Sequence, residues 1–347
     1  MTDMQIDTEE LRDSARRLLE KEVDRRARYA EPPREDGALY GKMAELGWML
    51  LTTPAEQDGL GQSFVALAPI YQELGRALAS VPFAGTMAAA DVLACVAHAS
   101  DLLARIGSGE AIFAVAEGDG LALNGSRASG TLADVLDGCK ATHLLLLAEK
   151  LFVIDLSVAG VTVGDVTTWD RSRSLADIQL DNAPATILAT GPDARAIVRA
   201  HLDLAIACDS LGGADQALTE AIAYMGTRQQ FNRPIGSFQA LKHRSADLKV
   251  ALEIARAFTN DACEAFVERR EGWASIAAQA KLLASETYHA ITEESVQFHG
   301  GIGFTWEHDC HLFLKRALLN EMLGGTPEQY RDRIAPDILR RAFAGRA

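Results

Sequence analysis

Four long stretches of helical periodicity in the C-terminal part of the chain constrain its fold most strongly. Their apolar residues recur every three or four positions, which is the pattern of a helix with one buried face. The predicted helices span residues 194–227, 238–270, 273–299 and 308–323. Gly212, Gly213 and Ala214 lie in the first of them, and their small size allows another helix to approach closely. Four long helices joined by short loops predict a four-helix bundle.

The rest of the chain reads as two further domains. In the first, apolar positions again recur at helical spacing and predict helices over residues 66–76 and 85–99. In the middle, short apolar runs alternate with Asn-Gly and Asp-Gly pairs, which is typical of strands in a small antiparallel barrel or sandwich. We therefore predict an α+β protein that is mostly helical. Its expected parts are an N-terminal helical domain (residues 1–112), a short β-barrel or sandwich domain (residues 113–190) and a C-terminal four-helix bundle (residues 191–347).

A glycine-rich stretch in the middle domain contains Gly118, Gly120, Gly125 and Gly130. Two of the spacings match the paired glycines of a phosphate-binding loop, but that loop needs a lysine after the second glycine. A serine and a threonine stand there instead. We interpret these glycines as hairpin turns.

Charge and cysteine content exclude several classes of protein. The chain has 48 acidic and 34 basic residues, a formal net charge of −14, and no basic stripe of the kind that binds nucleic acid. Five cysteines without a CxxC pair argue against a disulfide framework and indicate a reducing compartment. No apolar run is long enough for a membrane span, and the N-terminal segment has no apolar signal core. We expect a soluble, cytoplasmic protein without a nucleic-acid partner.

The segment RQQFNRPIGSFQ, from Arg228 to Gln239, is the first candidate binding motif. Pro234 and Gly236 interrupt the helical pattern, so the segment lies between two predicted helices. Arg228 offers a guanidinium fork for a pyrophosphate. Gln239 opens the next helix, where free backbone N–H groups favour an anion. The alternative interpretation is a solvated loop with an exposed arginine.

The segment QFHGGIGF, residues 297–304, is the second candidate motif. Gly300, Gly301 and Gly303 allow positive φ and a close approach of the backbone to a ligand. The alternative is a helix C-cap followed by a turn, for which one glycine would suffice.

A third cluster, EHDCH, brings metal-ligating residue types together. His308 and His311 are three positions apart on a predicted helix and could both reach one ion, with Glu307 and Cys310 beside them. Zinc sites need three or four protein ligands, and no second cluster matches this one in the sequence. We therefore interpret these residues as packing and capping groups and assign no metal.

Together, the domain order and the first two motifs resemble the acyl-CoA dehydrogenase family over nearly the whole chain. Three further segments carry the resemblance: LGWMLLTTPAEQDGLGQSF at residues 46–64, DRSR at residues 170–173 and TWEHDCHLFLKRA at residues 305–317. The last of these looks like the branch of the family that acts on steroid side chains.

The resemblance implies FAD as cofactor and an acyl-CoA thioester as substrate. In the family, a carboxylate base takes the α proton while the β hydrogen leaves as hydride to the flavin. The FAD of such tetramers lies across a subunit interface. By resemblance, the residues that contact the FAD of a neighbouring subunit are Arg228, Phe231, Gln239, Gln297, Gly300 and Gly301.

The chain departs from the family where the base should stand. The usual glutamate precedes a Gly-Thr pair, and Gly324 occupies its place here. Relatives with the base on the first bundle helix would carry it at Leu202, which cannot accept a proton either. The adjacent Asp203 lies where many relatives have an arginine. The middle domain also lacks the TEP…GSD and aromatic-Ile-Thr-Asn segments that surround the flavin ring in the family.

Three hypotheses remain open from the sequence, and the catalytic residue stays unassigned. The first is a dehydrogenase subunit without a base, paired with a catalytic paralogous subunit in an α2β2 tetramer that acts on a bulky acyl-CoA such as a steroid side chain. The second is a self-sufficient homotetramer with a relocated base, Asp203 or Glu328. The third is a non-catalytic assembly protein on the same fold.

Overall fold

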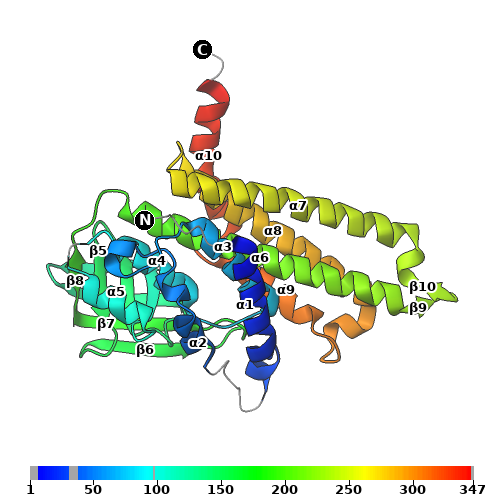
Figure 1. Ribbon diagram of the computed structural model, residues 1–347, viewed down its shortest axis with the longest axis horizontal. Helices are drawn as coiled ribbons and strands as arrows, with labels where there is room; N and C mark the ends of the chain where they lie inside the picture. The colour runs from blue at the N-terminus through cyan, green and yellow to red at the C-terminus, as the bar shows by residue number, and fades with distance from the viewer. Residues whose placement is uncertain (1–6, 31–37, 97, 345–347) are drawn as a thin grey trace. The chain divides into compact units, whose positions relative to one another are not determined.

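The computed structural model describes residues 7–30, 38–96 and 98–344, which form two compact units (Figure 1). Within the described residues, the first unit contains residues 26–67 and 80–202, and the second contains residues 7–25, 68–79 and 203–344. Each unit thus combines segments that are distant in sequence, and the division into three domains stays a prediction. None of the helices in these described stretches is both long and apolar enough to cross a membrane.

The helical part of the first unit consists of short elements. They are η1 (Ala27–Tyr29), α2 (Leu39–Glu45), η2 (Trp48–Leu50), η3 (Ala55–Gln57), α4 (Phe83–Leu93) and α5 (Ser100–Gly107). The single helix predicted over residues 85–99 is therefore wrong in its second half. The Thr86 hydroxyl accepts a hydrogen bond from the Phe113 N–H at 3.0 Å and so ties α4 to the first strand.

Two four-stranded sheets form the rest of this unit. The first has the order β1 (Phe113–Glu117), β4 (His143–Leu147), β5 (Leu151–Asp155), β8 (Thr186–Leu188), and the second has the order β2 (Ala122–Asn124), β3 (Arg127–Leu136), β7 (Leu175–Pro184), β6 (Val161–Val166). Side chains of both sheets, among them Leu144, Ile154 and Ile178, share one buried core, so the domain is a sandwich. The expectation of purely antiparallel strands is wrong for β1 and β4, which pair in parallel.

The glycines of the middle region have different roles. Gly120 and Gly125 have φ of 91° and 60° in the turns on either side of β2, as predicted. Gly130 lies inside β3 at φ 135°, beside a shift in the register between β3 and β7. The interpretation of Gly130 as a hairpin turn is therefore wrong, and this glycine marks a β-bulge.

The second unit is helical. Its elements are α1 (Thr8–Glu22), most of α3 (Phe64–Ala77), most of α6 (Ala194–Thr227), β9 (Gln229–Gln230), β10 (Arg233–Pro234), η4 (Ile235–Ser237), α7 (Gln239–Glu268), α8 (Trp273–His299), η5 (Gly300–Phe304), α9 (Cys310–Met322) and α10 (Pro327–Ala344). The four predicted bundle helices are confirmed to within two residues at each end. Figure 1 shows α7 and α8 running side by side along their length.

Glycines allow two of these helices to approach at backbone distance. A Cβ added to Gly212 of α6 would lie 1.8 Å from the carbonyl oxygen of Gln72, and one added to Gly75 of α3 would lie 1.9 Å from that of Asp209. Neither position can hold a side chain without separating α3 from α6. The close helix contact predicted at Gly212 is thus confirmed.

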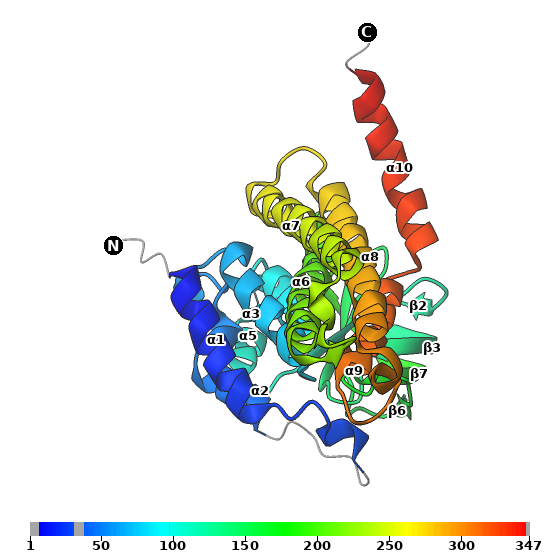
Figure 2. The ribbon, with the colours of Figure 1, turned by 90° about the vertical axis from the view of Figure 1, so that its right-hand side faces the viewer.

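The sequence analysis missed α10. Tyr330 and Ile334 on its first half pack against Ala278 and Leu282 of α8 in a buried cluster. The second half extends away from the other helices of the unit (Figure 2). Its apolar side chains are accordingly exposed, namely Ile338 (44%), Leu339 (54%) and Phe343 (60%).

Candidate functional site

The two sequence motifs meet at one end of the helical unit, where α6 ends, α7 begins and α8 ends (Figure 1). Met225 of α6 and Phe298 of α8 share a buried cluster, against which Ile235 and Leu241 pack. This cluster brings the hairpin after α6 and the glycine turn after α8 into one region of the surface.

A hairpin of β9 and β10 occupies part of the first motif. Its turn residues, Phe231 and Asn232, have φ of 52° and 60°, as a type I′ turn requires. Asparagine tolerates this conformation, but a phenylalanine there costs on the order of 1 kcal/mol. Phe231 is nevertheless 86% exposed, so its own burial does not offset the strain. Such strain at an exposed tip is typical of functional positions.

The start of α7 faces solvent beside this hairpin. The guanidinium of Arg233 lies 4.0 Å from the centre of the Phe238 ring, which braces the hairpin against the helix N-terminus. Phe238 is the N-cap and provides no side-chain hydrogen bond to the first turn. Gln239 therefore opens a helix whose first N–H groups have no side-chain cap.

The glycine turn after α8 has room for a neighbour. Gly300 has φ of 63°, which favours glycine on its own account. Gly301 has no such φ, and a Cβ added there would meet no described atom within 4 Å. By contrast, a Cβ at Gly303 would lie 2.8 Å from the Val296 carbonyl oxygen. Nothing within the described chain explains the glycine at 301, whereas a closely approaching ligand would.

The predicted contact residues present an open surface. All six are exposed, namely Arg228, Phe231, Gln239, Gln297, Gly300 and Gly301. The Arg228 backbone caps the hairpin by accepting a hydrogen bond from the Ile235 N–H at 2.8 Å. Its guanidinium makes no hydrogen bond or ion pair with any residue in the described part of the chain, and is available to an external anion.

The turn between α9 and α10 contains the position expected for the base. Gly324 and Gly325 have φ of 75° and 129° there. A Cβ added to Gly324 would lie 2.7 Å from the hydroxyl oxygen of Tyr330. A glutamate could take this position only by displacing Tyr330 and adopting a left-handed φ.

Asp203, the first candidate for a relocated base, is buried and held at both oxygens. Its Oδ1 accepts a short hydrogen bond from the Tyr330 hydroxyl, and its Oδ2 accepts one from Arg333 Nη2 at 2.6 Å. Burial raises the pKa of Asp203, although the charge of Arg333 acts in the opposite direction. Glu328, the second candidate, is exposed at the start of α10 and lies 3.6 Å from Arg331.

Lys281 of α8 completes this buried cluster, and the sequence analysis missed it. Its Nζ donates to the Glu321 carbonyl oxygen at 2.7 Å and lies 4.1 Å from the centre of the Tyr330 ring. Lys281 is fully buried, and this burial lowers its pKa to about 8. A lysine among the alanines and leucines of α8 was the available signal. The cluster ties α6, α8 and α10 together, and each oxygen of the buried Asp203 carboxylate accepts a hydrogen bond within it.

Comparison with known proteins decides the family. Models of the acyl-CoA dehydrogenase N-terminal and C-terminal domains match residues 6–108 and 200–339. The acyl-CoA dehydrogenase IpdE2 of Mycobacterium tuberculosis is 33% identical over 316 residues, which cover 90% of this chain and 90% of that protein. The chain belongs to the acyl-CoA dehydrogenase family. Its relatives are oxidoreductases that act on acyl-CoA.

Solved structures of acyl-CoA dehydrogenases share the architecture. A variant of the steroid acyl-CoA dehydrogenase Tcur3481–Tcur3483 matches with a TM-score of 0.86 at 27% identity, covering 96% of this chain and 98% of that one. The ChsE4–ChsE5 complex from Mycobacterium tuberculosis matches with a TM-score of 0.87 at 24% identity, covering 98% and 99%. The second likeness concerns the fold alone. Both confirm the predicted acyl-CoA dehydrogenase fold.

Proposed function

We propose that this chain is the subunit of an FAD-dependent acyl-CoA dehydrogenase that lacks a base and contributes binding residues to the FAD of a catalytic paralogous partner. The observation that carries the proposal is the closed position at Gly324, where the Tyr330 hydroxyl occupies the space of a side chain. Asp203 is engaged by Tyr330 and Arg333 instead of facing a substrate.

The surface formed by the six exposed residues at the end of the helical unit suits the phosphate and adenosine part of a dinucleotide. The Arg228 guanidinium, which has no side-chain partner among the described residues, can hold a pyrophosphate, and the start of α7 at Gln239, which has no side-chain cap, favours the same charge. Gly300 and Gly301 leave the backbone open to close approach. When bound, FAD accepts the hydride that leaves the β carbon of the substrate. The role proposed for this chain is to hold and orient that cofactor from across the interface.

The proposed substrate class is a bulky acyl-CoA, such as a steroid side chain. Its support is the TWEHDCHLFLKRA segment at residues 305–317 together with the likeness to a steroid acyl-CoA dehydrogenase. The proposed assembly is an α2β2 tetramer, because the similar solved structures Tcur3481–Tcur3483 and ChsE4–ChsE5 each combine two components.

Two other functions receive less support. A self-sufficient homotetramer would need Asp203 or Glu328 as base. However, Asp203 is buried and hydrogen-bonded, and Glu328 is exposed beside Arg331. A non-catalytic assembly protein would have no use for a strained, exposed Phe231 or for Gly301.

The deciding experiment compares the purified chain alone with the chain co-expressed with an acyl-CoA dehydrogenase paralogue from the same genome that carries a glutamate base. We expect no dehydrogenation by the single chain, and FAD retention with turnover of a steroid acyl-CoA by the complex. High turnover by the chain alone would refute the subunit proposal. A stable complex whose FAD content does not change on Arg228→Ala would favour the assembly protein.

A further inference from the structure

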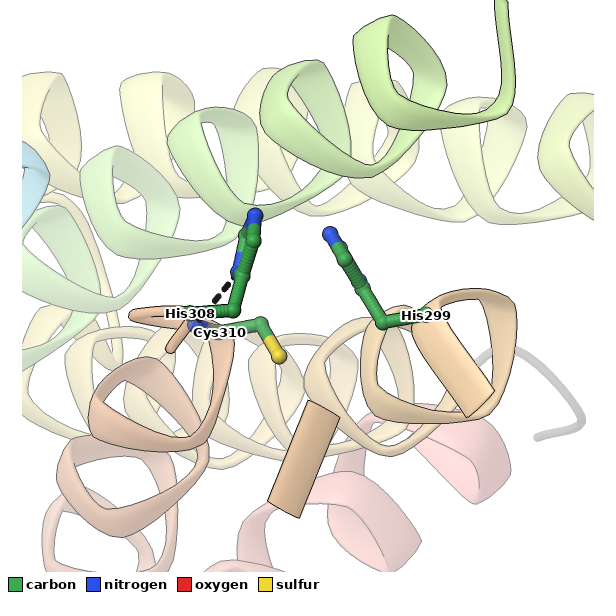
Figure 3. Close-up of side chains that lie close together, drawn as sticks. All are labelled: His299, His308 and Cys310. Carbon is green, nitrogen blue, oxygen red and sulfur yellow. Dashed lines mark hydrogen bonds between the residues drawn. The ribbon is translucent and has the colours of Figure 1, made fainter. Parts of the chain in front are cut away.

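The glycine turn between α8 and α9 brings together three side chains that the function above does not use. His299 ends α8, His308 precedes α9, and Cys310 is its first residue. Figure 3 shows the two imidazole rings facing each other with the Cys310 sulfur below them. One potential ligand atom from each residue lies within 4.8 Å of the other two.

His299 presents a buried lone pair to this cluster. Its Nδ1 lies 2.6 Å from the Ser295 carbonyl oxygen, and since a carbonyl only accepts, Nδ1 carries the hydrogen. The lone pair of the neutral ring is then on Nε2. His299 is 4% exposed, and among the described residues its Nε2 has no hydrogen-bond partner. An unpartnered buried acceptor of this kind costs about 1–3 kcal/mol.

The other two side chains offer compatible donors. Nδ1 of His308 accepts a hydrogen bond from the Cys310 backbone N–H at 3.2 Å, so the lone pair of this ring lies inside the cluster and would exchange that hydrogen bond for a bond to an ion. The ring centres of His299 and His308 are 3.9 Å apart. The Cys310 thiol is buried and donates to the Gly303 carbonyl oxygen at 3.4 Å.

We propose that His299, His308 and Cys310 form a site for Zn²⁺ or a similar transition-metal ion, with water in the fourth position. Two imidazoles and a thiolate suit zinc rather than magnesium or calcium, which prefer oxygen ligands. The hydrogen bond from His299 to Ser295 is the arrangement that orients a metal-binding histidine. On binding, the Cys310 thiol loses its proton to solvent and a sulfur–metal bond replaces its contact with Gly303.

The geometry requires only small movements. Donor atoms around a tetrahedral zinc lie about 3.5 Å apart, so shifts of about 1 Å would close the site. The bound ion would clip the end of α8 to the start of α9 across the turn that contains Gly300 and Gly301. Its predicted effect is to stiffen that turn.

The fold also explains why the EHDCH segment alone was a poor guide. His311, three positions after His308, turns away and packs edge-on against Trp306 with ring centres 4.9 Å apart. The histidine that completes the cluster is His299, which lies beyond the glycine turn. The competing interpretation is that the rings merely stack, since Tyr224 lies 4.4 Å from the His299 ring.

Cobalt titration of the full chain tests the proposal without any activity assay. Protein stripped with a chelator is titrated with Co²⁺, followed by absorption, and then challenged with Zn²⁺. We expect one ion per chain, the visible bands of a tetrahedral cobalt ion, a sulfur-to-cobalt charge-transfer band, and displacement of both by zinc. Absence of the charge-transfer band from the wild-type protein would leave ring stacking as the explanation.

Variants assign the ligands. Cys310→Ser should abolish the charge-transfer band, and His308→Gln should weaken cobalt binding by at least about tenfold. The matched control is His311→Gln, which removes a neighbouring imidazole outside the cluster and should leave the spectrum unchanged. Circular dichroism of each variant shows whether it folds. Equal cobalt spectra in folded Cys310→Ser and wild-type protein would overturn the assignment.

Discussion

A Cβ atom on Gly324 would lie 2.7 Å from the hydroxyl oxygen of Tyr330. That hydroxyl is itself fixed by its hydrogen bond to Asp203, which also accepts from Arg333. Tyr330 thus links the position expected for a catalytic glutamate, Gly324, to Asp203, the buried carboxylate considered as an alternative base.

This link predicts that substitutions at Gly324 and Tyr330 are coupled. Gly324→Ala should destabilise the chain by about 1–3 kcal/mol, because it adds a contact with the hydroxyl to a left-handed φ. In a Tyr330→Phe background the contact is gone and only the φ strain remains, so the same change should cost less. Urea unfolding of the two single variants and the double variant measures the coupling. Additive costs would mean that Tyr330 does not close the position.

Substitution of Phe231 should increase the stability of the chain and decrease its binding of FAD. Phe231→Asn suits the left-handed φ better and should raise the free energy of unfolding of the isolated chain by about 0.5–1 kcal/mol. The same variant should retain less FAD in the complex with its partner. Asn232→Gly is the control, because it relaxes the adjacent turn position and keeps the ring. Unchanged FAD content in Phe231→Asn would show that the ring is not a contact.

Arg228→Ala should lower FAD affinity without affecting the fold. Loss of a charged hydrogen-bond donor of about 1.5–3 kcal/mol predicts an affinity about 10 to 150 times weaker. The melting temperature of the isolated chain should not change, because the Arg228 guanidinium has no partner within the described residues. Arg17→Ala, on the exposed side of α1, is the matched control. Flavin absorbance of the purified complex reports the result.

The predicted helices were recovered because their signal is local. An apolar stripe such as that of α7, with Leu252, Ala255 and Ala262 buried, can be read from spacing alone. α10 was missed because much of its surface is charged, and the apolar side chains of its second half, Ile338, Leu339 and Phe343, are exposed. The parallel pairing of β1 with β4 was unpredictable from turns, since the intervening chain passes through the other sheet.

The residues of the candidate site also differ in whether the sequence alone could predict their positions. The exposed positions of Arg228 and Gln239 follow from a helix break that is visible in the sequence. The burial of Lys281 and the meeting of His299 with His308 depend on how helices pack, which spacing within one helix does not reveal.

The buried Lys281 should make the free energy of unfolding depend on pH. Burial lowers its pKa to about 8, whereas an unfolded lysine holds its proton to about pH 10.4. Between these values the unfolded chain binds more protons than the folded chain, so the contribution of Lys281 to stability increases as pH rises. The difference in free energy of unfolding between wild type and Lys281→Met should therefore shift in favour of wild type from pH 8 to 10, by up to about 3 kcal/mol.

Chemical denaturation at several pH values measures that shift. Lys242→Met, at an exposed position of α7, controls for the other groups that titrate in this range. A pH-independent difference for Lys281→Met would indicate that the lysine is already neutral, or remains charged throughout.

The Gly324–Tyr330 contact also bears on the ancestry of the chain. A mutation that restored glutamate at position 324 would meet an occupied space and a backbone that disfavours side chains, so by itself it would first reduce stability. Room for that glutamate would need a second change at Tyr330, and removal of the tyrosine hydroxyl would leave an oxygen of buried Asp203 without its donor. Either change made alone is thus expected to destabilise the chain, and the packing would oppose a stepwise gain of a glutamate at position 324.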